Sequence, residues 1–419
     1  MNDVVVIGAG PAGLTLACAL ARDGLSCLVV EKEHHPRPHV GESLMPAAVR
    51  VMRDIGFLPV MESAGFPRSG GVVYHPRVGF DVELPYADFP LRDEEQSWTW
   101  HVDRARFDLL LLKHAEALGC RILEGVAVEE VVFEGDRAVG VRADAAGESL
   151  LLPARFVVDA GGRGTRLGRQ LDLRRDHSKL AQVALHSWFE GVDRGRHRRR
   201  SWTHVYFLPE VRGWAWQAPI DADITSIGVV ASRSRYQDAG LEPEHFFKAS
   251  LLGNHKLARV TRGARRIDDM KGDVNYSYRL ERVCGDGWLA VGDAARFIDP
   301  VFSSGVTVAM HSARRAASVV RDALRDGDVS REALLPYEFD VLAQGAIWDD
   351  FTRLFYRLLP GFTHLLESRE YRPALARLIQ GDVLDQGDAD VLDTLRALVR
   401  GVEESDTHPW RDQLAEVRF

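Results

Sequence analysis

The chain has 419 residues, of which 46% are hydrophobic, so it is long enough and apolar enough for two or three domains with sizeable cores. Its net charge of −8 argues against nucleic acid as a partner over the whole surface. No apolar run reaches the roughly 18 residues of a membrane-spanning helix, and the first strand starts almost at the N-terminus, which leaves no room for a signal peptide. The four cysteines lie far apart and lack metal-ligand spacing. We therefore predict a soluble cytoplasmic protein with no membrane partner, no disulfide framework and no metal site.

The first thirty residues predict a strand, a glycine-rich turn, a helix and a second strand. Residues 4–7 form a β-branched run typical of a buried parallel strand, and residues 8–13 then read Gly-x-Gly-x-x-Gly. A helix with alanine and leucine on its apolar side follows and ends at Asp23-Gly24. The second strand, residues 28–30, ends at Glu31. An acidic side chain about 20 residues beyond the glycines is placed to accept from ribose hydroxyls.

The glycines in residues 8–13 indicate a dinucleotide site. The first makes the turn, the second lets a pyrophosphate approach the backbone, and the third allows the helix to pack closely on the strand. The pyrophosphate would then lie at the helix N-terminus, where free N–H groups and the helix dipole favour an anion. The alternative is a glycine turn in some other α/β protein.

The next part of the chain alternates between helices and short strands. Residues 34–39 are a proline-rich loop, and Pro46 suits the first turn of a helix over residues 47–55. Short alternating segments from 65 to 100 predict β-hairpins, including 71–74 and 78–84. A helix is expected over 107–118, and successive strands are expected at 121–123, 127–133, 138–143 and 152–160.

A second sheet is predicted in the middle of the chain. Four segments of strand type occur at regular spacing, which suggests an antiparallel sheet: 182–189, 202–208, 213–220 and 225–231. A buried strand at 287–293 and a long helix at 306–324 then return to the first domain, which is therefore discontinuous. We predict a dinucleotide-binding domain of 1–64, 101–175 and 276–329, a substrate sheet domain of 65–100 and 176–275, and a helical region of 330–419.

The helical region carries bulky apolar residues at helical spacing. Two functions are open for it: closing the active site over the second domain, or offering a face to a partner. Plain packing is the alternative. The one dense basic run, residues 194–200, is predicted to be a solvated loop, or else to dock an acidic group such as a carrier protein or a phosphate.

Five motifs occur in order: the glycine turn of 8–13, Gly-Glu-Ser-Leu-Met-Pro at 41–46, Val-x-Arg-x-x-Phe-Asp at 102–108, Asp-Ala-Gly-Gly-Arg at 159–163, and 292–306. The last reads Gly-Asp-Ala-Ala-x-Phe-Ile-Asp-Pro-Val-Phe-Ser-Ser-Gly-Val. Together they resemble the flavin-dependent halogenases of natural-product (antibiotic) biosynthesis and their aromatic-hydroxylase relatives. The resemblance implies FAD, an α/β fold like that of p-hydroxybenzoate hydroxylase, and chemistry through a flavin hydroperoxide.

The same resemblance implies where FAD binds. It places Glu31 and Arg104, with the glycine turn, on the adenosine diphosphate half, and Asp293 on the ribityl chain. The free N–H groups that open the helix at Val306 would face the isoalloxazine and stabilise negative charge on it. The full set of implied cofactor residues is Gly8, Gly10, Pro11, Ala12, Gly13, Glu31, Lys32, Arg37, Ser43, Arg104, Val128, Asp159, Gly161, Gly292, Asp293, Pro300, Gly305 and Val306.

Four catalytic candidates follow from the resemblance: Trp214, Trp216, Ser304 and Gly305. Residues 214–219 are similar to the halogenase signature Trp-x-Trp-x-Ile-Pro, with alanine in place of isoleucine. Strand periodicity puts both tryptophans on one face of the sheet. They are equally consistent with plain packing of that face. The backbone N–H groups near Ser304 and Gly305 would suit a halide.

The chain departs from the halogenases at one lysine. Halogenases of this group carry a lysine in a Phe-x-x-Lys stretch, where it is thought to deliver hypohalous acid to the substrate. Here Phe66 is followed by Pro, Arg68 and Ser69, and no lysine occurs between Lys32 and Lys113. A guanidinium stays protonated and offers no nucleophilic amine. This departure favours hydroxylation over halogenation.

A second departure concerns the residue before the Ser-Ser-Gly segment. Tryptophan-type halogenases place a glutamate near this position, whereas this chain has Phe302, as phenol-type and carrier-bound-substrate relatives do. A free-tryptophan substrate is therefore not expected.

Our reading from the sequence is an FAD-dependent monooxygenase that hydroxylates an electron-rich aromatic substrate. The alternatives are a halogenase of a phenolic or carrier-bound substrate, a flavin dehydrogenase or reductase, and a protein that uses FAD only structurally. The sequence leaves open whether the substrate is carrier-bound and whether a separate flavin reductase supplies reduced FAD. Candidate substrate walls are Trp98, Trp100, Trp214 and Trp216, and candidate acids or bases are His75, His101, His186 and His204.

Overall fold

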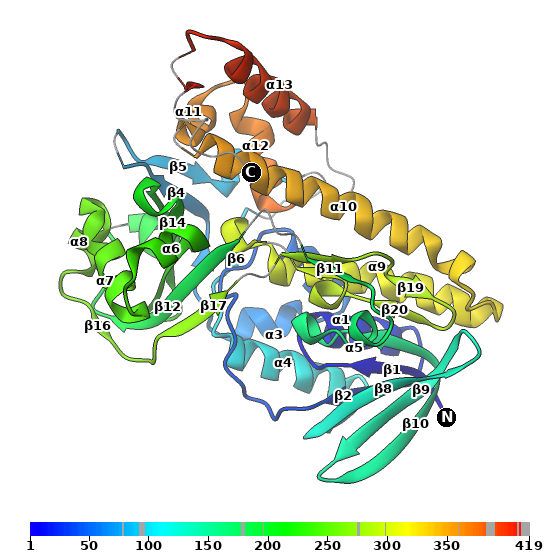
Figure 1. The fold of residues 1–419 in the computed structure, drawn as a ribbon. Helices are drawn as coiled ribbons and strands as arrows, with labels where there is room; N and C mark the ends of the chain where they lie inside the picture. The colour runs from blue at the N-terminus through cyan, green and yellow to red at the C-terminus, as the bar shows by residue number, and fades with distance from the viewer. Residues whose placement is uncertain are drawn as a thin grey trace.

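The computed structural model describes residues 1–77, 79–91, 97–176, 181–195, 197–274, 277–297, 299–359, 361–382, 390–408 and 410–411. Val78, where one predicted strand begins, Arg196 of the basic run and Ile298 of the last motif lie outside the described residues. Figure 1 shows two sheets side by side, with the C-terminal helices packed against the second.

The first sheet has the strand order β19-β20-β10-β1-β2-β7, and the pairs from β20 to β7 are parallel. Its strands are β1 (Asn2–Ile7), β2 (Cys27–Glu31), β7 (Arg121–Glu124), β10 (Glu148–Asp159), β19 (Cys284–Gly285) and β20 (Trp288–Ala290). Residues Val4 to Val6 are fully buried, as expected for a parallel strand covered on both faces. Helix α1 (Pro11–Arg22) packs between this sheet and its neighbours and contacts both α4 (Arg104–Ala117) and α9 (Gly305–Asp326). The predicted strand, turn, helix and strand are confirmed.

Strand β10 also continues into an antiparallel meander with β8 (Val126–Glu134) and β9 (Arg137–Ala145), visible at the lower right of Figure 1. Two short helices, α2 (Ala48–Asp54) and α3 (Leu58–Ser63), follow the loop after β2, close to the predicted helix over 47–55.

The second sheet has the order β16-β12-β15-β14-β13-β4-β5, with β17 also paired to β12. Its strands are β4 (Gly71–His75), β5 (Val82–Pro85), β12 (Gln182–Glu190), β13 (Thr203–Leu208), β14 (Gly213–Pro219), β15 (Ile224–Ser232), β16 (Arg265–Arg266) and β17 (Lys271–Val274). The four predicted strands are present. Each of these four strands is antiparallel to its neighbour among them, as expected, whereas β4, which is not one of the four, pairs with β13 in parallel. The two strands come from separate parts of the chain, so no hairpin constrains their direction.

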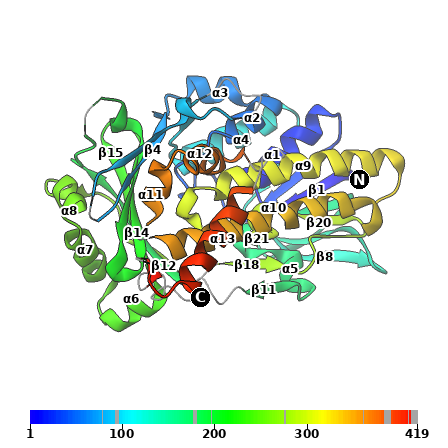
Figure 2. The same cartoon turned by 90° about the horizontal axis from the view of Figure 1, so that it is seen from above.

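Helices cover both faces of the second sheet. Helices α6 (Arg233–Ala239), α7 (Pro243–Gly253) and α8 (His255–Thr261) lie on the outer side in Figure 1, where Phe246 and Phe247 join one apolar cluster. The other face packs against α10 (Arg331–Leu358), α11 (Phe362–Glu367), α12 (Arg372–Gln380) and α13 (Asp390–Glu404). Figure 2 shows these helices between the second sheet and the long helix α9.

Two small sheets connect these parts. One joins β11 (Arg174–Asp176), β18 (Tyr278–Leu280) and β21 (Arg296–Phe297), and the other pairs β3 (Arg68–Ser69) with β6 (Thr99–Trp100). Among the described helices, none combines the length and the apolar character needed to cross a bilayer. The predicted domain boundaries are compatible with this layout but stay a prediction.

Candidate active site

The glycine turn after β1 forms a cradle with room for a diphosphate. Gly8 has φ +100°, and a Cβ there would meet the carbonyl oxygen of Ala160 at 2.6 Å. A Cβ at Gly13 would lie 2.0 Å from the Gly8 oxygen, so only glycine lets α1 pack so closely. At Gly10, by contrast, a Cβ would meet only the Arg37 guanidinium, at 3.8 Å. The space before Gly10 is therefore open, beside an arginine and the N-terminus of α1, which fits a pyrophosphate.

Glu31 lies at the mouth of this turn. Its two carboxylate oxygens accept hydrogen bonds from the backbone N–H groups of Ala9, at 2.8 Å, and Glu33, at 3.0 Å. Arg37 approaches the same carboxylate at 3.6 Å. Glu31 thus braces the glycine turn. Its expected contact with ribose stays a prediction.

The Arg104 guanidinium forms its hydrogen bonds with other residues of the protein. Its guanidinium makes a bidentate pair with Asp108, at 2.9 and 3.0 Å, and donates to the carbonyl oxygen of Val40 at 2.7 Å. Both charged groups are buried, and a paired arrangement of this kind avoids leaving either charge unsatisfied. The structure therefore shows Arg104 holding the loop before Glu42, and a direct contact with FAD remains a prediction.

The two aspartates of the motifs differ in their surroundings. The Asp159 carboxylate accepts from the N–H groups of Gly161 and Leu167 and from the Thr165 hydroxyl, so it stabilises the turn after β10. Asp293 has no side-chain hydrogen bond to any described residue, and desolvation raises its pKa to about 6. A half-buried carboxyl group whose oxygens have no partner among the described residues fits the hydroxyls of a ribityl chain.

The segment from Pro300 to Gly305 forms a tight loop that opens α9. Pro300–Phe302 is a 3₁₀ turn, and Ser303 adopts φ +55°. A Cβ at Gly305 would meet no atom within 4 Å. The space beside Gly305, at the N-terminus of a 22-residue helix, is therefore open, which fits the place that the resemblance implies for the isoalloxazine.

Ser43 joins the first domain to the second sheet. Its hydroxyl lies 2.8 Å from Nδ1 of His101 and 3.3 Å from the hydroxyl of Thr203. His101 also reaches the Ser201 carbonyl oxygen at 3.0 Å, and burial lowers its pKa to about 4. A neutral His101 with both ring nitrogens engaged fits a structural role better than an acid–base role.

The remaining implied cofactor residues lie on several elements of the first domain. Pro11 and Ala12 open α1, Val306 and Gly41 approach each other, and the N–H of Gly292 donates to Ser312. Lys32 directly follows β2 and Val128 lies within β8.

Trp214 and Trp216 share one face of β14, as predicted, with ring centroids 5.7 Å apart. The indole N–H of Trp214 donates to the Tyr356 hydroxyl at 3.0 Å. That hydroxyl donates to the carboxyl of Asp299, at 3.1–3.2 Å. This chain of hydrogen bonds connects the sheet, α10 and the residue before Pro300. Burial raises the pKa of Asp299 to about 7.

Trp216 leads to a second buried carboxyl group. Its N–H donates to the Ser226 hydroxyl at 3.0 Å, and that hydroxyl donates to Glu42 at 2.9 Å. Trp188 donates to the other oxygen of Glu42 at 2.6 Å. Desolvation raises the pKa of Glu42, which is 5% exposed. We call Trp188, Trp216, Ser226 and Glu42 the Glu42 cluster.

Glu42 and Asp299 were not singled out from the sequence, although each lies within a recognised motif. Their partners come from β12, β15 and α10, far away along the chain. The sequence did contain one signal for them, a carboxylate inside an otherwise apolar motif. Burying such a group requires hydrogen-bond donors from other parts of the chain.

The other aromatic and histidine candidates do not converge on one site. Trp98 and Trp100 pack edge to face at 4.6 Å, and Trp100 belongs to the core of the first domain. His75 and His204 contact each other at 2.8 Å on the side of the sheet where Tyr206 and α8 pack. Of the four candidate histidines, His186 lies near Trp216, with ring centroids 5.7 Å apart, and burial lowers its pKa to about 4.

Ser69 occupies the place where the resemblance expects lysine. It is buried, and its hydroxyl donates to the Gly71 carbonyl oxygen at 3.2 Å. The exposed Arg68 lies over the Trp98 ring at 4.0 Å. Neither residue supplies an amine. Lys271 of β17 is a different case: its ammonium lies 5.7 Å from the ring centre of Trp188 and pairs with Asp268 at 2.5 Å.

Known proteins resemble this chain over most of its length. A family model described as FAD binding domain matches residues 1–346. A 1H-pyrrole-2-carbonyl-[peptidyl-carrier protein] chlorinase from Pseudomonas fluorescens is 37% identical, over 99% of this chain and 97% of that protein. The corresponding brominase from Pseudoalteromonas luteoviolacea is 31% identical, over 91% of this chain and 92% of that protein. This chain belongs to the flavin-dependent halogenase family.

Solved structures agree with this assignment. The flavin-dependent brominase Bmp2 is 28% identical with a TM-score of 0.87, over 96% of this chain and 99% of that protein. This member of the flavin-dependent halogenase family is an FAD-dependent oxidoreductase, with FAD as its cofactor. The hydroxylase reading from the sequence is not confirmed, and the relatives support its halogenase alternative better.

Proposed function

We propose that this enzyme halogenates a pyrrole-type acyl group attached to a carrier protein. The observation that carries the proposal is the similarity to the Pseudomonas fluorescens chlorinase, which extends over 99% of this chain and 97% of that protein. A second relative, the brominase, is described with the same pyrrole-carrier substrate. The likeness therefore includes the second sheet and the C-terminal helices as well as the FAD-binding part.

The second sheet and the loop at Pro300 would hold the aromatic ring of the substrate near the cofactor. Trp214 and Trp216 lie on the face of the sheet that Phe302 and α10 cover. The Tyr356–Asp299 contact fixes the Trp214 indole relative to that loop, and the Glu42 cluster fixes Trp216. Bound FAD, once reduced, supplies the activation of O₂.

Lys271 is the residue that we propose to hold the oxidised halogen near the substrate. Ser69 has no amine, and its hydroxyl is already engaged. The Lys271 ammonium, which pairs with Asp268, is a hydrogen-bond donor beside Trp188 of the Glu42 cluster. It would act by donating hydrogen bonds, because an ion-paired ammonium is not a nucleophile.

The test uses a peptidyl-carrier protein loaded with pyrrole-2-carbonyl, with reduced FAD, O₂, and chloride or bromide. We expect mass spectrometry of the intact carrier to show a halogen in place of hydrogen, while free pyrrole-2-carboxylate is not modified. Lys271→Met should lower the halogenated fraction about tenfold or more with FAD content unchanged, since one charge-assisted contact is lost. Lys248→Met, which removes an exposed lysine of α7, is the control. A carrier without halogen, or preferred turnover of the free acid, would contradict the proposal.

Hydroxylation is the second candidate, and a specific observation favours it. The position at which the family resemblance expects an amine holds a buried serine. Transfer of oxygen to the ring needs no amine to hold an intermediate. Hydroxylation would therefore not be impaired by serine in place of lysine at position 69.

A further inference from the structure

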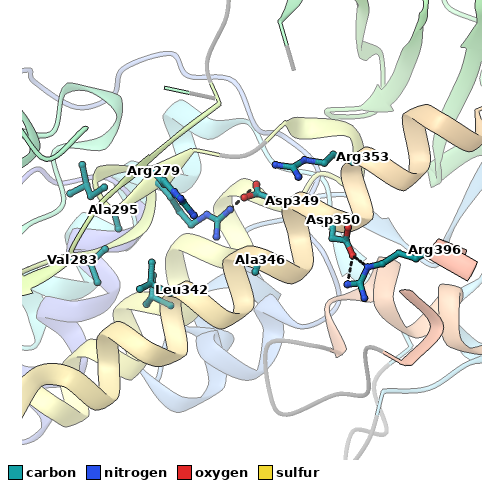
Figure 3. Close-up of a pocket in the computed structure, with 12 residues that line it drawn as sticks. Arg279, Val283, Ala295, Leu342, Ala346, Asp349, Asp350, Arg353 and Arg396 are labelled. Carbon is teal, nitrogen blue, oxygen red and sulfur yellow. Dashed lines mark hydrogen bonds and ion pairs between the residues drawn. The ribbon is translucent and has the colours of Figure 1, made fainter. Parts of the chain in front are cut away.

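A cavity of about 410 Å³ lies between α10 and strands β18 and β21, with α13 at its edge (Figure 3). None of the residues implied in FAD binding or catalysis lines it. Its volume falls within the range of pockets that bind small molecules, roughly 300–1,000 Å³.

The charges around this cavity are unbalanced. Four arginines and two aspartates line it. The Asp349 carboxylate pairs with Arg296 at 2.7 Å, and the Asp350 carboxylate pairs with Arg396 at 2.6 Å. Each of the two carboxylates therefore has an arginine partner. The remaining two guanidinium groups, those of Arg279 and Arg353, are exposed and make no hydrogen bond or ion pair with any described residue.

Arg296 is a buried part of the cavity lining. Its side chain is 8% exposed, and its Nε has no hydrogen-bond partner among the described residues. The guanidinium crosses α10 at Gly345, where a Cβ would lie 1.0 Å from Nη1. A glycine inside a helix costs about 1 kcal/mol relative to alanine, so the helix gives up stability where the arginine needs space. Burial and the like charge of Arg279 both lower the pKa of Arg296, although Asp349 opposes them.

The rest of the lining is apolar. Leu280, Val283 and Ala295 form one wall, and Val341, Leu342 and Ala346 form the other. Guanidinium groups match the planar oxygens of carboxylate and phosphate, whereas aliphatic walls favour a hydrocarbon group. We propose that this cavity binds a small organic anion, a carboxylate or phosphate on an apolar body, with Arg279 and Arg353 pairing with its oxygens.

The experiment measures binding of two probes, benzoate and phenyl phosphate, to the FAD-loaded enzyme by calorimetry, with benzyl alcohol as the uncharged control. We expect at least one anion to bind saturably and the alcohol not to bind. The tighter probe identifies the preferred head group. Arg279→Gln and Arg353→Gln should each weaken binding about tenfold, because each removes a charge-assisted hydrogen-bonding partner.

Arg325→Gln is the matched control, since it removes the same charge from an exposed position of α9 paired with Asp322 and Asp326. It should bind the probes with wild-type affinity. All three variants alter exposed residues, so they are expected to fold and retain FAD. The proposal is overturned if neither anion binds the wild-type enzyme, or if both pocket variants bind as well as the Arg325 variant.

Discussion

Gly10 gives the most local test of the cofactor site. A Cβ added at Gly10 would come within 4 Å of the Arg37 guanidinium and, apart from Gly10's own chain neighbours, of no other described atom. A valine side chain would occupy the place of the pyrophosphate, so Gly10→Val should abolish FAD binding while the protein stays folded. The flavin absorbance per protein after gel filtration measures this. Wild-type flavin stoichiometry in the variant would refute the assignment of the cradle.

Asp299 makes the stability of the enzyme depend on pH. Burial raises its pKa from 3.8 to about 7, so between these values the folded state holds a proton that the unfolded state has released. Stability must then fall as the pH rises through this window, by up to about 4 kcal/mol for a shift of roughly three units. Asp299→Asn has no proton to lose at this position.

We therefore expect the free energy of unfolding of Asp299→Asn to increase relative to wild type between about pH 4 and pH 7. Thermal or urea unfolding of the FAD-loaded proteins at several pH values measures the difference. If the free energies of unfolding of the two proteins changed with pH in the same way, Asp299 would be ionised in the folded state across this range. The claim that burial raises its pKa would then be wrong.

At the level of elements, α10 joins the second sheet to the loop that opens α9. Phe351 of α10 stacks on Phe302 with ring centroids 4.0 Å apart, and Phe355 packs edge to face on both Phe302 and Phe207. The helix therefore fills the space between sheet and loop. This confirms packing as one task of the C-terminal region, and its proposed functions in closure or partner binding stay predictions.

Truncation of a side chain in this contact should be costly. Phe351 is fully buried, so Phe351→Ala should lower the free energy of unfolding by about 3–5 kcal/mol. Phe339→Ala, at an exposed position of the same helix, should change it by less than about 0.5 kcal/mol. Urea denaturation measures both. Equal effects would mean that α10 does not hold the loop at Phe302.

The elements themselves were largely predictable, whereas their long-range contacts were not. The glycine turn and the strands and helices follow from local periodicity and from residues with few backbone options. Glu42 and Trp188 lie 146 positions apart, and Trp214 and Tyr356 lie 142 apart. No periodic pattern couples such residues, because their contact depends on how two sheets and α10 pack. The parallel pairing of β13 with β4 was missed for the same reason.

At the scale of the whole molecule, position 69 departs from the halogenase pattern that the resemblance describes. The FAD-binding domain model and the full length of the chlorinase relative both match this chain, yet position 69 holds a buried serine where the resemblance expects lysine. If Lys271 carries the task of the missing lysine, the relocation moves the charged group from the β3–β6 pair to β17 of the second sheet.

An oxygen-labelling experiment with the loaded carrier is the most direct test of the proposed halogenase activity. The enzyme is given reduced FAD, excess bromide, isotopically labelled O₂ and a carrier bearing pyrrole-2-carbonyl, and the pyrrole is analysed by mass spectrometry. We expect bromine on the ring and no labelled oxygen, because in halogenation both oxygen atoms of O₂ end in water, whereas in hydroxylation one of them is transferred to the ring. Labelled oxygen on the ring without bromine would contradict halogenation and establish the hydroxylase instead.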